Sequence, residues 1–211
     1  MKVTLEQALE LLRSGNCQLG MHLAFELSRV GSQGCKQLAN VLISGLCPTH
    51  LYLDFKGNHL GENGVKSLVC ALESGRCPPG LRLGFENTNI DDEAVQLLAS
   101  ALASRNCPAR LYLNLRWNSI SDRGVAALAR ALASGLCPAG LQLHLGRNGI
   151  GNIGAQALAD AFTCGNCPSA LFLGLDGNNI NNKGAFVLAN AISESQCPPG
   201  LYIEIGYNPI T

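Results

Sequence analysis

Leucine and isoleucine alternate with polar residues in short segments that recur along the whole chain. In one of them, Leu111, Leu113 and Leu115 flank Tyr112 and Asn114. A period of two predicts a strand with one buried face. Segments with this alternation begin thirty residues apart, and the first is the weakest: 21–25, 51–55, 81–85, 111–115, 141–145, 171–175 and 201–205. The pattern therefore predicts about seven strand units of period 30.

A helical pattern follows each strand segment. Leu128, Ala131 and Leu132 have the spacing of a helix with one apolar stripe. Ser121 is a favourable N-cap, and Asp92 in another unit suits the positive end of its helix. Glycine and a Cys-Pro pair then end most of the units. Alternating strands and helices predict an α/β fold with parallel strands.

Cysteine marks the repeat more regularly than any other residue. Seven of the ten cysteines occupy one repeat position: Cys17, Cys47, Cys77, Cys107, Cys137, Cys167 and Cys197. A fixed period of this kind indicates a stack of similar units, each covering the apolar face of its neighbour. Cysteines at one position fall in separate layers. We therefore expect them to be reduced and packed in a column, not joined as disulfides.

Asparagine occupies a second regular position, three residues after the strand segment: Asn58, Asn118, Asn148, Asn178 and Asn208. An amide carries both donor and acceptor groups. Turned inward, it is expected to satisfy backbone groups of its own bend and of the next layer. Ser28 and Thr88 replace it in two units. We expect those two layers to be less well hydrogen-bonded.

The combined pattern L-x-L-x-x-N-x-I-x-x-x-G-x-x-x-L over residues 113–128 resembles the leucine-rich repeat of the ribonuclease-inhibitor-like, long-helix type. The resemblance implies a leucine-rich-repeat solenoid (horseshoe), with parallel strands on the concave side and helices on the convex side. The period of thirty exceeds the roughly 20–29 usual for such repeats, which predicts altered curvature. The Cys-Pro-x-x-Leu-x-Leu run is also similar to repeats of secreted effectors of intracellular bacterial pathogens.

We expect residues 1–211 to form a single domain. Residues 1–20 are expected to hold an N-terminal capping helix, with a capping box at Thr4 and Gln7. A C-terminal cap is missing after strand 201–205, whose open apolar edge predicts either a longer parent protein or edge-to-edge self-association. The first residues do not have the apolar core of a conventional signal peptide. This predicts a cytoplasmic protein, or an effector secreted into a host cell.

The net charge and the candidate chemical motifs of the chain disfavour several classes of function. The formal net charge is +0, which disfavours a nucleic-acid partner and a polybasic membrane contact. The G-x-G-x-x-G at 149–154 falls on glycine positions of the repeat, and the C-x-x-C at 164–167 includes a cysteine of the column. The four histidines share no recurring carboxylate pattern. We expect no active site, no cofactor and no metal.

The residues expected on the concave strand face give the clearest indication of function. All four tyrosines and the single tryptophan lie on this face or its rim, and Tyr, Trp and Arg are the residues that anchor interfaces. Candidate partner-binding residues are Tyr52, Arg82, Tyr112, Arg116, Trp117, Gln142, His144, Phe172 and Tyr202. Simple covering of the sheet by large side chains is the competing explanation.

The sequence indicates two alternative functions. The first is a non-catalytic protein–protein interaction module that binds a partner protein on its concave face. The second is the targeting domain of a larger secreted enzyme whose catalytic part lies outside the chain.

Overall fold

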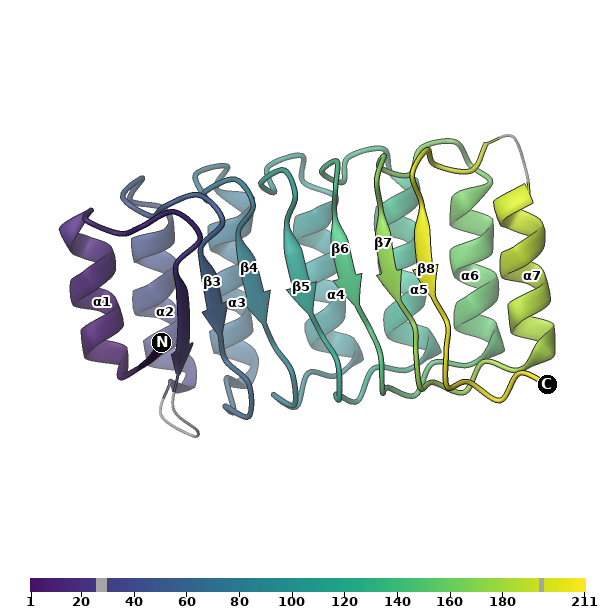
Figure 1. The fold of residues 1–211 in the computed structure, drawn as a ribbon, viewed down its shortest axis with the longest axis horizontal. Helices are drawn as coiled ribbons and strands as arrows, with labels where there is room; N and C mark the ends of the chain where they lie inside the picture. The colour runs from purple at the N-terminus through teal and green to yellow at the C-terminus, as the bar shows by residue number, and fades with distance from the viewer. Residues whose placement is uncertain (26–29, 194–195) are drawn as a thin grey trace.

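The computed structural model describes residues 1–25, 30–193 and 196–211, so Ser28 lies outside the described residues. Strands and helices alternate along the chain (Figure 1). The strands are β1 Lys2–Val3, β2 His22–Phe25, β3 Tyr52–Asp54, β4 Arg82–Gly84, β5 Tyr112–Asn114, β6 Gln142–His144, β7 Phe172–Gly174 and β8 Tyr202–Glu204. The helices are α1 Leu5–Ser14, α2 Gly31–Leu42, α3 Gly61–Glu73, α4 Asp92–Leu102, α5 Asp122–Ala133, α6 Asn152–Phe162 and α7 Asn182–Ser193.

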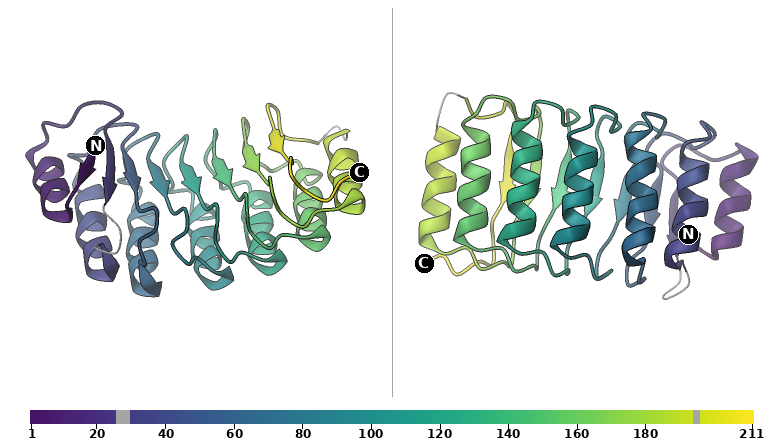
Figure 2. Two further views of the ribbon diagram at one scale, coloured as in Figure 1. Left: turned by 60° about the horizontal axis from the view of Figure 1, so that its bottom comes forward. Right: turned by 180° about the vertical axis from the view of Figure 1, so that it is seen from behind.

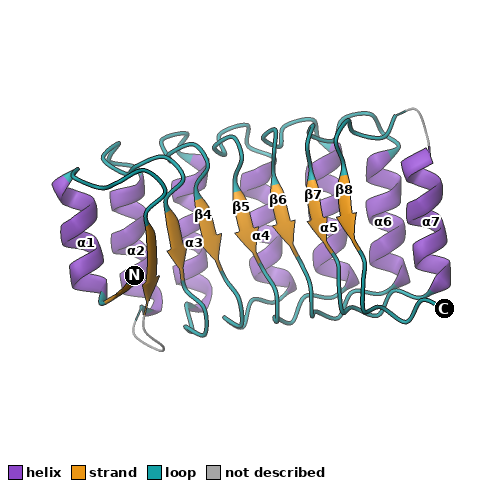
Figure 3. Cartoon of the chain, in the orientation of Figure 1, coloured by secondary structure: helices purple, strands orange, loops and turns teal. Residues whose placement is uncertain are grey.

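The strands form one eight-stranded parallel sheet in chain order. Tyr112 pairs with Arg82 on one side and with Gln142 on the other, so the register advances by one repeat per strand. The helices stack in a row behind the sheet, and together the two layers form an open arc (Figures 2 and 3). The predicted α/β solenoid is confirmed.

All seven expected strand units are present, and β1 is an eighth strand that the sequence did not predict. Lys2 and Val3 pair with Ala24 and Phe25 of β2. Two residues are too few to show an alternation of period two, so this strand leaves no pattern in the sequence. Helix α1 follows it and has the predicted capping box between Thr4 and Gln7.

Leucine and isoleucine fill the space between the two layers. Leu113, Leu115, Ile120 and Leu128 are all 0% exposed, as the alternation predicted. The neighbouring repeats repeat the arrangement, so the core is continuous along the arc. Truncating such a leucine to alanine typically destabilises a protein by about 2–5 kcal/mol.

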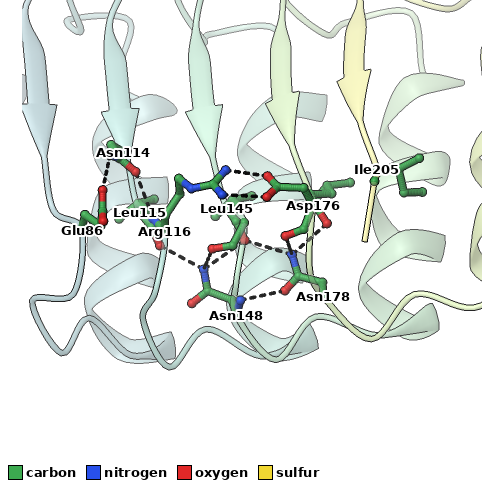
Figure 4. A network of polar contacts seen from close by, with 12 residues as sticks. Glu86, Asn114, Leu115, Arg116, Leu145, Asn148, Asp176, Asn178 and Ile205 are labelled. Atoms are coloured by element: carbon green, nitrogen blue, oxygen red, sulfur yellow. Dashed lines mark hydrogen bonds and ion pairs between the residues drawn. The ribbon is translucent and has the colours of Figure 1, made fainter. Parts of the chain in front are cut away.

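The asparagine column forms a hydrogen-bonded ladder, but each amide bridges back to the preceding repeat, not forward to the next one as expected. The Nδ2 group of Asn118 donates to the carbonyls of Leu115 (3.1 Å) and Phe85 (2.7 Å). Its Oδ1 accepts from the backbone N–H groups of Thr88 and Ile90. Asn148 and Asn178 make the same bonds one and two layers further on (Figure 4).

Thr88 interrupts this ladder in the third unit. Its buried hydroxyl donates to the Phe85 carbonyl (2.7 Å), which keeps the bond within its own bend. A hydroxyl is too short to supply the second donor and the acceptor that an amide sends to the preceding repeat. A cleft of about 500 Å³ opens at this layer, and its lining includes His59, Thr88 and Asn89. We therefore expect weaker hydrogen bonding between the third unit and the unit that precedes it.

The regularly spaced cysteines are free and lie singly in their layers, as predicted. Each thiol of Cys17 through Cys167 donates to a carbonyl of the helix that precedes it, as Cys107 does to Ala101 (3.3 Å). The thiol shares this carbonyl at the helix end with other donors, as at Ala101, which also accepts from the N–H and hydroxyl of Ser104. Burial raises the pKa of the thiols of Cys77, Cys107, Cys137 and Cys167 to about 12, which makes these members of the column poor nucleophiles.

A second inter-repeat bond holds the helix starts. Oδ1 of Asp92 accepts from the backbone N–H groups of Ser121 (2.8 Å) and Gly124 (3.0 Å), at the beginning of α5. Sequence analysis placed Asp92 at the start of its own helix, but its carboxylate also caps the next one. A Cβ atom at Gly124 would clash with Asp92, which explains the glycine.

The two ends of the arc differ. The outer side of β8 faces no further strand, and Leu201, Ile203 and Ile205 are half-buried where their counterparts in earlier repeats are fully buried. Self-association through this edge stays a prediction. No helix among the described residues is long and apolar enough to cross a membrane.

Candidate protein-binding face

The concave face presents the outward positions of the strands, and most candidate residues fall in one column across them. Strand pairing places Tyr52, Arg82, Tyr112, Gln142, Phe172 and Tyr202 side by side from β3 to β8. His144 lies two residues further along β6. Arg116 and Trp117 follow β5 at the rim of the face. The fold therefore gathers all nine predicted residues on one surface.

Arg82 lies between two tyrosine rings in the first part of the column. Its guanidinium carbon is 4.2 Å from the centroid of Tyr112 and 5.0 Å from that of Tyr52. Tyr52 in turn stacks on His22, with ring centroids 4.2 Å apart. These distances are those of aromatic stacking and cation–π contact.

His144 continues the series into the second part of the column. Its ring centroid lies 4.7 Å from Tyr112 and 4.5 Å from Phe172, and Tyr202 stacks on Phe172 at 5.3 Å. We call the continuous series the aromatic ladder; it consists of His22, Tyr52, Arg82, Tyr112, His144, Phe172 and Tyr202. Gln142 is exposed and stands beside the ladder without taking part in these ring contacts.

Small residues on the second column make room for the ladder. A Cβ atom at Gly84 would lie 2.8 Å from the hydroxyl oxygen of Tyr52, and one at Gly174 would touch Phe172 and His144. Tyr52 therefore leans over Gly84 of the adjacent strand, whereas the space at Gly174 is filled at ordinary contact distance. Sequence analysis could not predict this, because the leaning depends on which neighbours in the stack lack a side chain.

Two ladder groups have shifted ionisation. Burial, and then the charges of Arg116 and Arg82, lower the pKa of His144 from 6.5 to about 4. Its Nε2 is buried and has no hydrogen-bond partner among the described residues. Burial, followed by the nearby Asp54 carboxylate, raises the pKa of Tyr52 to about 12. Both rings are neutral at physiological pH. His144 lies on the concave face as expected, and the two flanking rings half-bury it there.

Ion pairs fix the rim of the face. Arg116 donates two parallel bonds to Asp176, at 2.6 and 2.7 Å, although strand β6 lies between their repeats. The pair crosses over Gly146, where a Cβ atom would lie 2.7 Å from Nη1 of Arg116 (Figure 4). Lys56 pairs with Glu86 at 2.7 Å. The Arg116 guanidinium is therefore committed to an internal partner.

Trp117 stands further out on the rim and is 53% exposed. The guanidinium carbon of Arg147 lies 5.1 Å from its ring centroid, and 6.0 Å from that of Tyr207 on the other side. All three residues have positive φ angles, between 55° and 58°. That backbone region is disfavoured for L-residues by roughly 1–2 kcal/mol each.

The two motifs that resemble cofactor or redox sites, G-x-G-x-x-G at 149–154 and C-x-x-C at 164–167, make hydrogen bonds within the repeat scaffold. The N–H of Gly151, which would face a phosphate in a dinucleotide site, donates to the Asp122 carboxylate of the preceding repeat. The thiols of Cys164 and Cys167 both donate to the Ala161 carbonyl. The described part of the chain holds no group of three or more His, Cys, Asp or Glu side chains suited to a metal ion.

Comparison with known families agrees with this geometry. A family model described as a leucine-rich repeat matches residues 111–129 and 141–159, which cover β5 with most of α5 and β6 with most of α6. The chain folds as a leucine-rich-repeat solenoid. A search of the curated proteins finds no match for it. Leucine-rich repeats of this kind suggest a protein–protein interaction module, and in this solenoid the exposed side chains of Trp117, Tyr202 and Tyr207 lie on the concave face or its rim.

Proposed function

We propose that this leucine-rich-repeat solenoid is a non-catalytic interaction module that binds a partner protein on its concave face. The aromatic ladder is the observation that carries the proposal. Its tyrosine and arginine side chains belong to the types that dominate binding energy in protein interfaces. They are already ordered by stacking on one another, which reduces the entropy lost on binding.

The dimensions of the face suit this role. At roughly 4.8 Å between strands, eight strands give a floor on the order of 34 Å long, which is enough for an interface of standard size. The repeat bonds make this floor rigid: the asparagine ladder on one side and the cysteine column on the other. The competing explanation is that large side chains merely cover the sheet. Such side chains need not contact one another, whereas the rings of the aromatic ladder are stacked and held in place.

The finer assignments rest on sequence resemblance alone. We propose that the protein acts in a cytoplasm, as an effector inside a host cell, since its repeats are similar to those of secreted bacterial effectors. The alternative, a targeting domain of a larger secreted enzyme, shares the concave interface and adds a catalytic part elsewhere. Both versions require the same binding face, so one experiment on that face tests what they have in common.

Site-specific photo-crosslinking tests the face directly. Benzoylphenylalanine placed at Tyr112 keeps an aromatic ring in the ladder, and the same group at Arg130 samples the exposed surface of α5. In cytosolic extract, we expect one discrete crosslinked protein from position 112 and none from position 130. A crosslink of equal yield from both positions, or from 130 alone, contradicts the proposal.

A further inference from the structure

We propose that Trp117, Arg147 and Tyr207, together called the rim cluster, form an anchor site for an aspartate or glutamate side chain on an extended segment of the partner protein. The inference rests on the proposed function, because it assumes that the rim of the concave face is part of the interface. It adds the chemistry of the partner, which the aromatic ladder alone leaves open.

The geometry of the stack leaves the guanidinium edge available. Arg147 lies between two rings, at 5.1 Å from the Trp117 centroid and 6.0 Å from the Tyr207 centroid. Contacts of this kind engage the faces of the guanidinium plane, while its N–H donors lie in the plane. The side chain is exposed. Its planar fork matches a carboxylate with two parallel hydrogen bonds.

The charges around the cluster favour an anion. The other basic side chains that reach the same rim are paired, Lys56 with Glu86 and Arg116 with Asp176. Asp176 is bonded to Arg147 only through the backbone, where its carbonyl accepts the N–H of Arg147, and both of its carboxylate oxygens are bound by Arg116. Within the described residues, Arg147 forms no ion pair.

The backbone supplies a second, independent observation. The repeat requires a positive φ at this position, and Gly57 and Gly177 meet that requirement without a Cβ atom. Asn87 adopts it as an asparagine can, but three repeats place Trp117, Arg147 and Tyr207 there, at angles that bulky residues rarely adopt. Strained backbone that holds exposed side chains is characteristic of binding sites.

A positive φ angle alone does not identify a binding site. His50 and Arg110 also have positive φ angles, at another repeat position, and each covers the glycine of the next layer. Neither has a guanidinium held between two rings. The rim cluster is distinguished by three properties together: strained backbone, high exposure of its rings, and an arginine stacked between them. Trp117 is 53% and Tyr207 is 87% exposed.

A protein carboxylate fits better than a nucleic acid. The chain has a formal net charge of +0, and Asp54, Glu86 and Glu204 lie on the same concave face. A polyanionic backbone would be repelled by these carboxylates and gains from neutralising several phosphates at once. One guanidinium between two rings instead matches a single carboxylate, with room on the rings for an adjacent apolar group.

The only tryptophan of the chain is in the cluster, so its fluorescence reports on this site alone. The probe is acetylated, amidated pentaglutamate, with pentaglutamine as the uncharged control. We expect pentaglutamate to change Trp117 emission saturably with a Kd below about 1 mM, as suits one small anchor. Labelled peptide followed by anisotropy gives the same constant without relying on the tryptophan.

Variants test whether Arg147 is the residue that binds pentaglutamate. Arg147→Gln should weaken pentaglutamate binding at least tenfold, and Arg147→Lys should weaken it less, because it keeps the charge but loses the planar fork. Arg130→Gln on exposed α5 removes one positive charge elsewhere and should leave the affinity unchanged. Circular dichroism of each variant checks that it folds. Equal affinity for pentaglutamine, full binding by Arg147→Gln, or preferential saturation by inorganic phosphate overturns the proposal.

Failure of this inference is separable from failure of the proposed function. Tyr52→Ala removes a ladder ring but touches none of the rim cluster, so it should leave pentaglutamate binding unchanged. If pentaglutamate does not bind while position 112 still crosslinks a partner, the acidic anchor is wrong and the binding face stands. If pentaglutamate binds as expected but no partner crosslinks, the cluster is an anion site and the proposed interface is wrong.

Discussion

Arg116 and Asp176 form a two-bonded ion pair that spans the strand between their repeats. The side chain of Asp176 is 7% exposed and that of Arg116 28%. Gly146 on the intervening repeat leaves the path open. The hydrogen bond to Asp176 raises the pKa of Arg116. The pair links three layers of the stack at the edge of the binding face.

Asp176→Asn should destabilise the fold markedly for one surface-facing residue. It leaves the half-buried guanidinium of Arg116 without a charge partner, which we expect to lower the free energy of unfolding by about 1–3 kcal/mol. Urea denaturation measures the change. Lys66→Ala breaks the exposed i,i+4 pair with Glu62 and should cost only about 0.3–0.5 kcal/mol. Equal losses in the two variants would show that the long pair adds nothing.

The asparagine ladder should contribute more per residue than its threonine replacement. Asn148→Ala leaves the carbonyls of Leu115 and Leu145, and the N–H groups of Asn118 and Ile120, without their amide partner. We expect a loss of about 3 kcal/mol in urea denaturation. Thr88→Ala removes one hydroxyl bond and should cost about 1 kcal/mol. A larger loss at Thr88 than at Asn148 contradicts the ladder as described.

His144 should make stability pH-dependent in a defined window. Folding lowers its pKa from 6.5 to about 4, so between these values the unfolded chain binds more protons than the folded one. This contribution is complete above pH 6.5 and is lost as the pH falls towards 4. Because the ring is only half-buried, we limit it to about 2 kcal/mol.

His144→Phe keeps a ring between Tyr112 and Phe172 but cannot titrate. Urea midpoints measured from pH 7 to pH 4 should therefore fall more steeply for the wild type than for the variant. Other titrating groups are common to both proteins and cancel in the difference. Parallel profiles would show that His144 is not kept neutral by the fold.

The cysteines should differ widely in reactivity. Cys70 and Cys164 are exposed, whereas burial raises the pKa of Cys77, Cys107 and Cys137 to about 12. A brief pulse of iodoacetamide followed by peptide mass spectrometry should label positions 70 and 164 first. The column should become labelled only in urea. Crosslinked column sulfurs, or early labelling of Cys107, would refute the single-layer arrangement.

The solenoid was predictable because its regular positions repeat in the sequence itself. The alternation seen at Leu113 and Leu115 predicts a strand in seven units, and an asparagine like Asn118 predicts a bend in five of them. Contacts between different repeats were less accessible: the capping of α5 by Asp92 and the burial of His144 depend on which residues the stack brings opposite each other. Strand β1 was missed because two residues carry no period.

The candidate face was predictable as a set but not in its internal division. Alternation along each strand placed eight of the nine residues on one side and Trp117 next to them, which the structure reproduces. Sequence could not separate Arg82, held between tyrosine rings, from Arg116, bound to Asp176, because both are arginines on the same face. Their roles follow from partners one or two repeats away.

The affinity of the crosslinked partner for ladder variants tests the central claim most directly. Isothermal titration calorimetry compares the wild type with Tyr112→Ala on the concave face and with Arg130→Ala on exposed α5. Loss of a central aromatic anchor should weaken binding at least tenfold, or about 1.4 kcal/mol. The α5 variant should bind as the wild type does. Unchanged affinity for Tyr112→Ala, with a loss for Arg130→Ala, would place the interface on the helices and contradict the account.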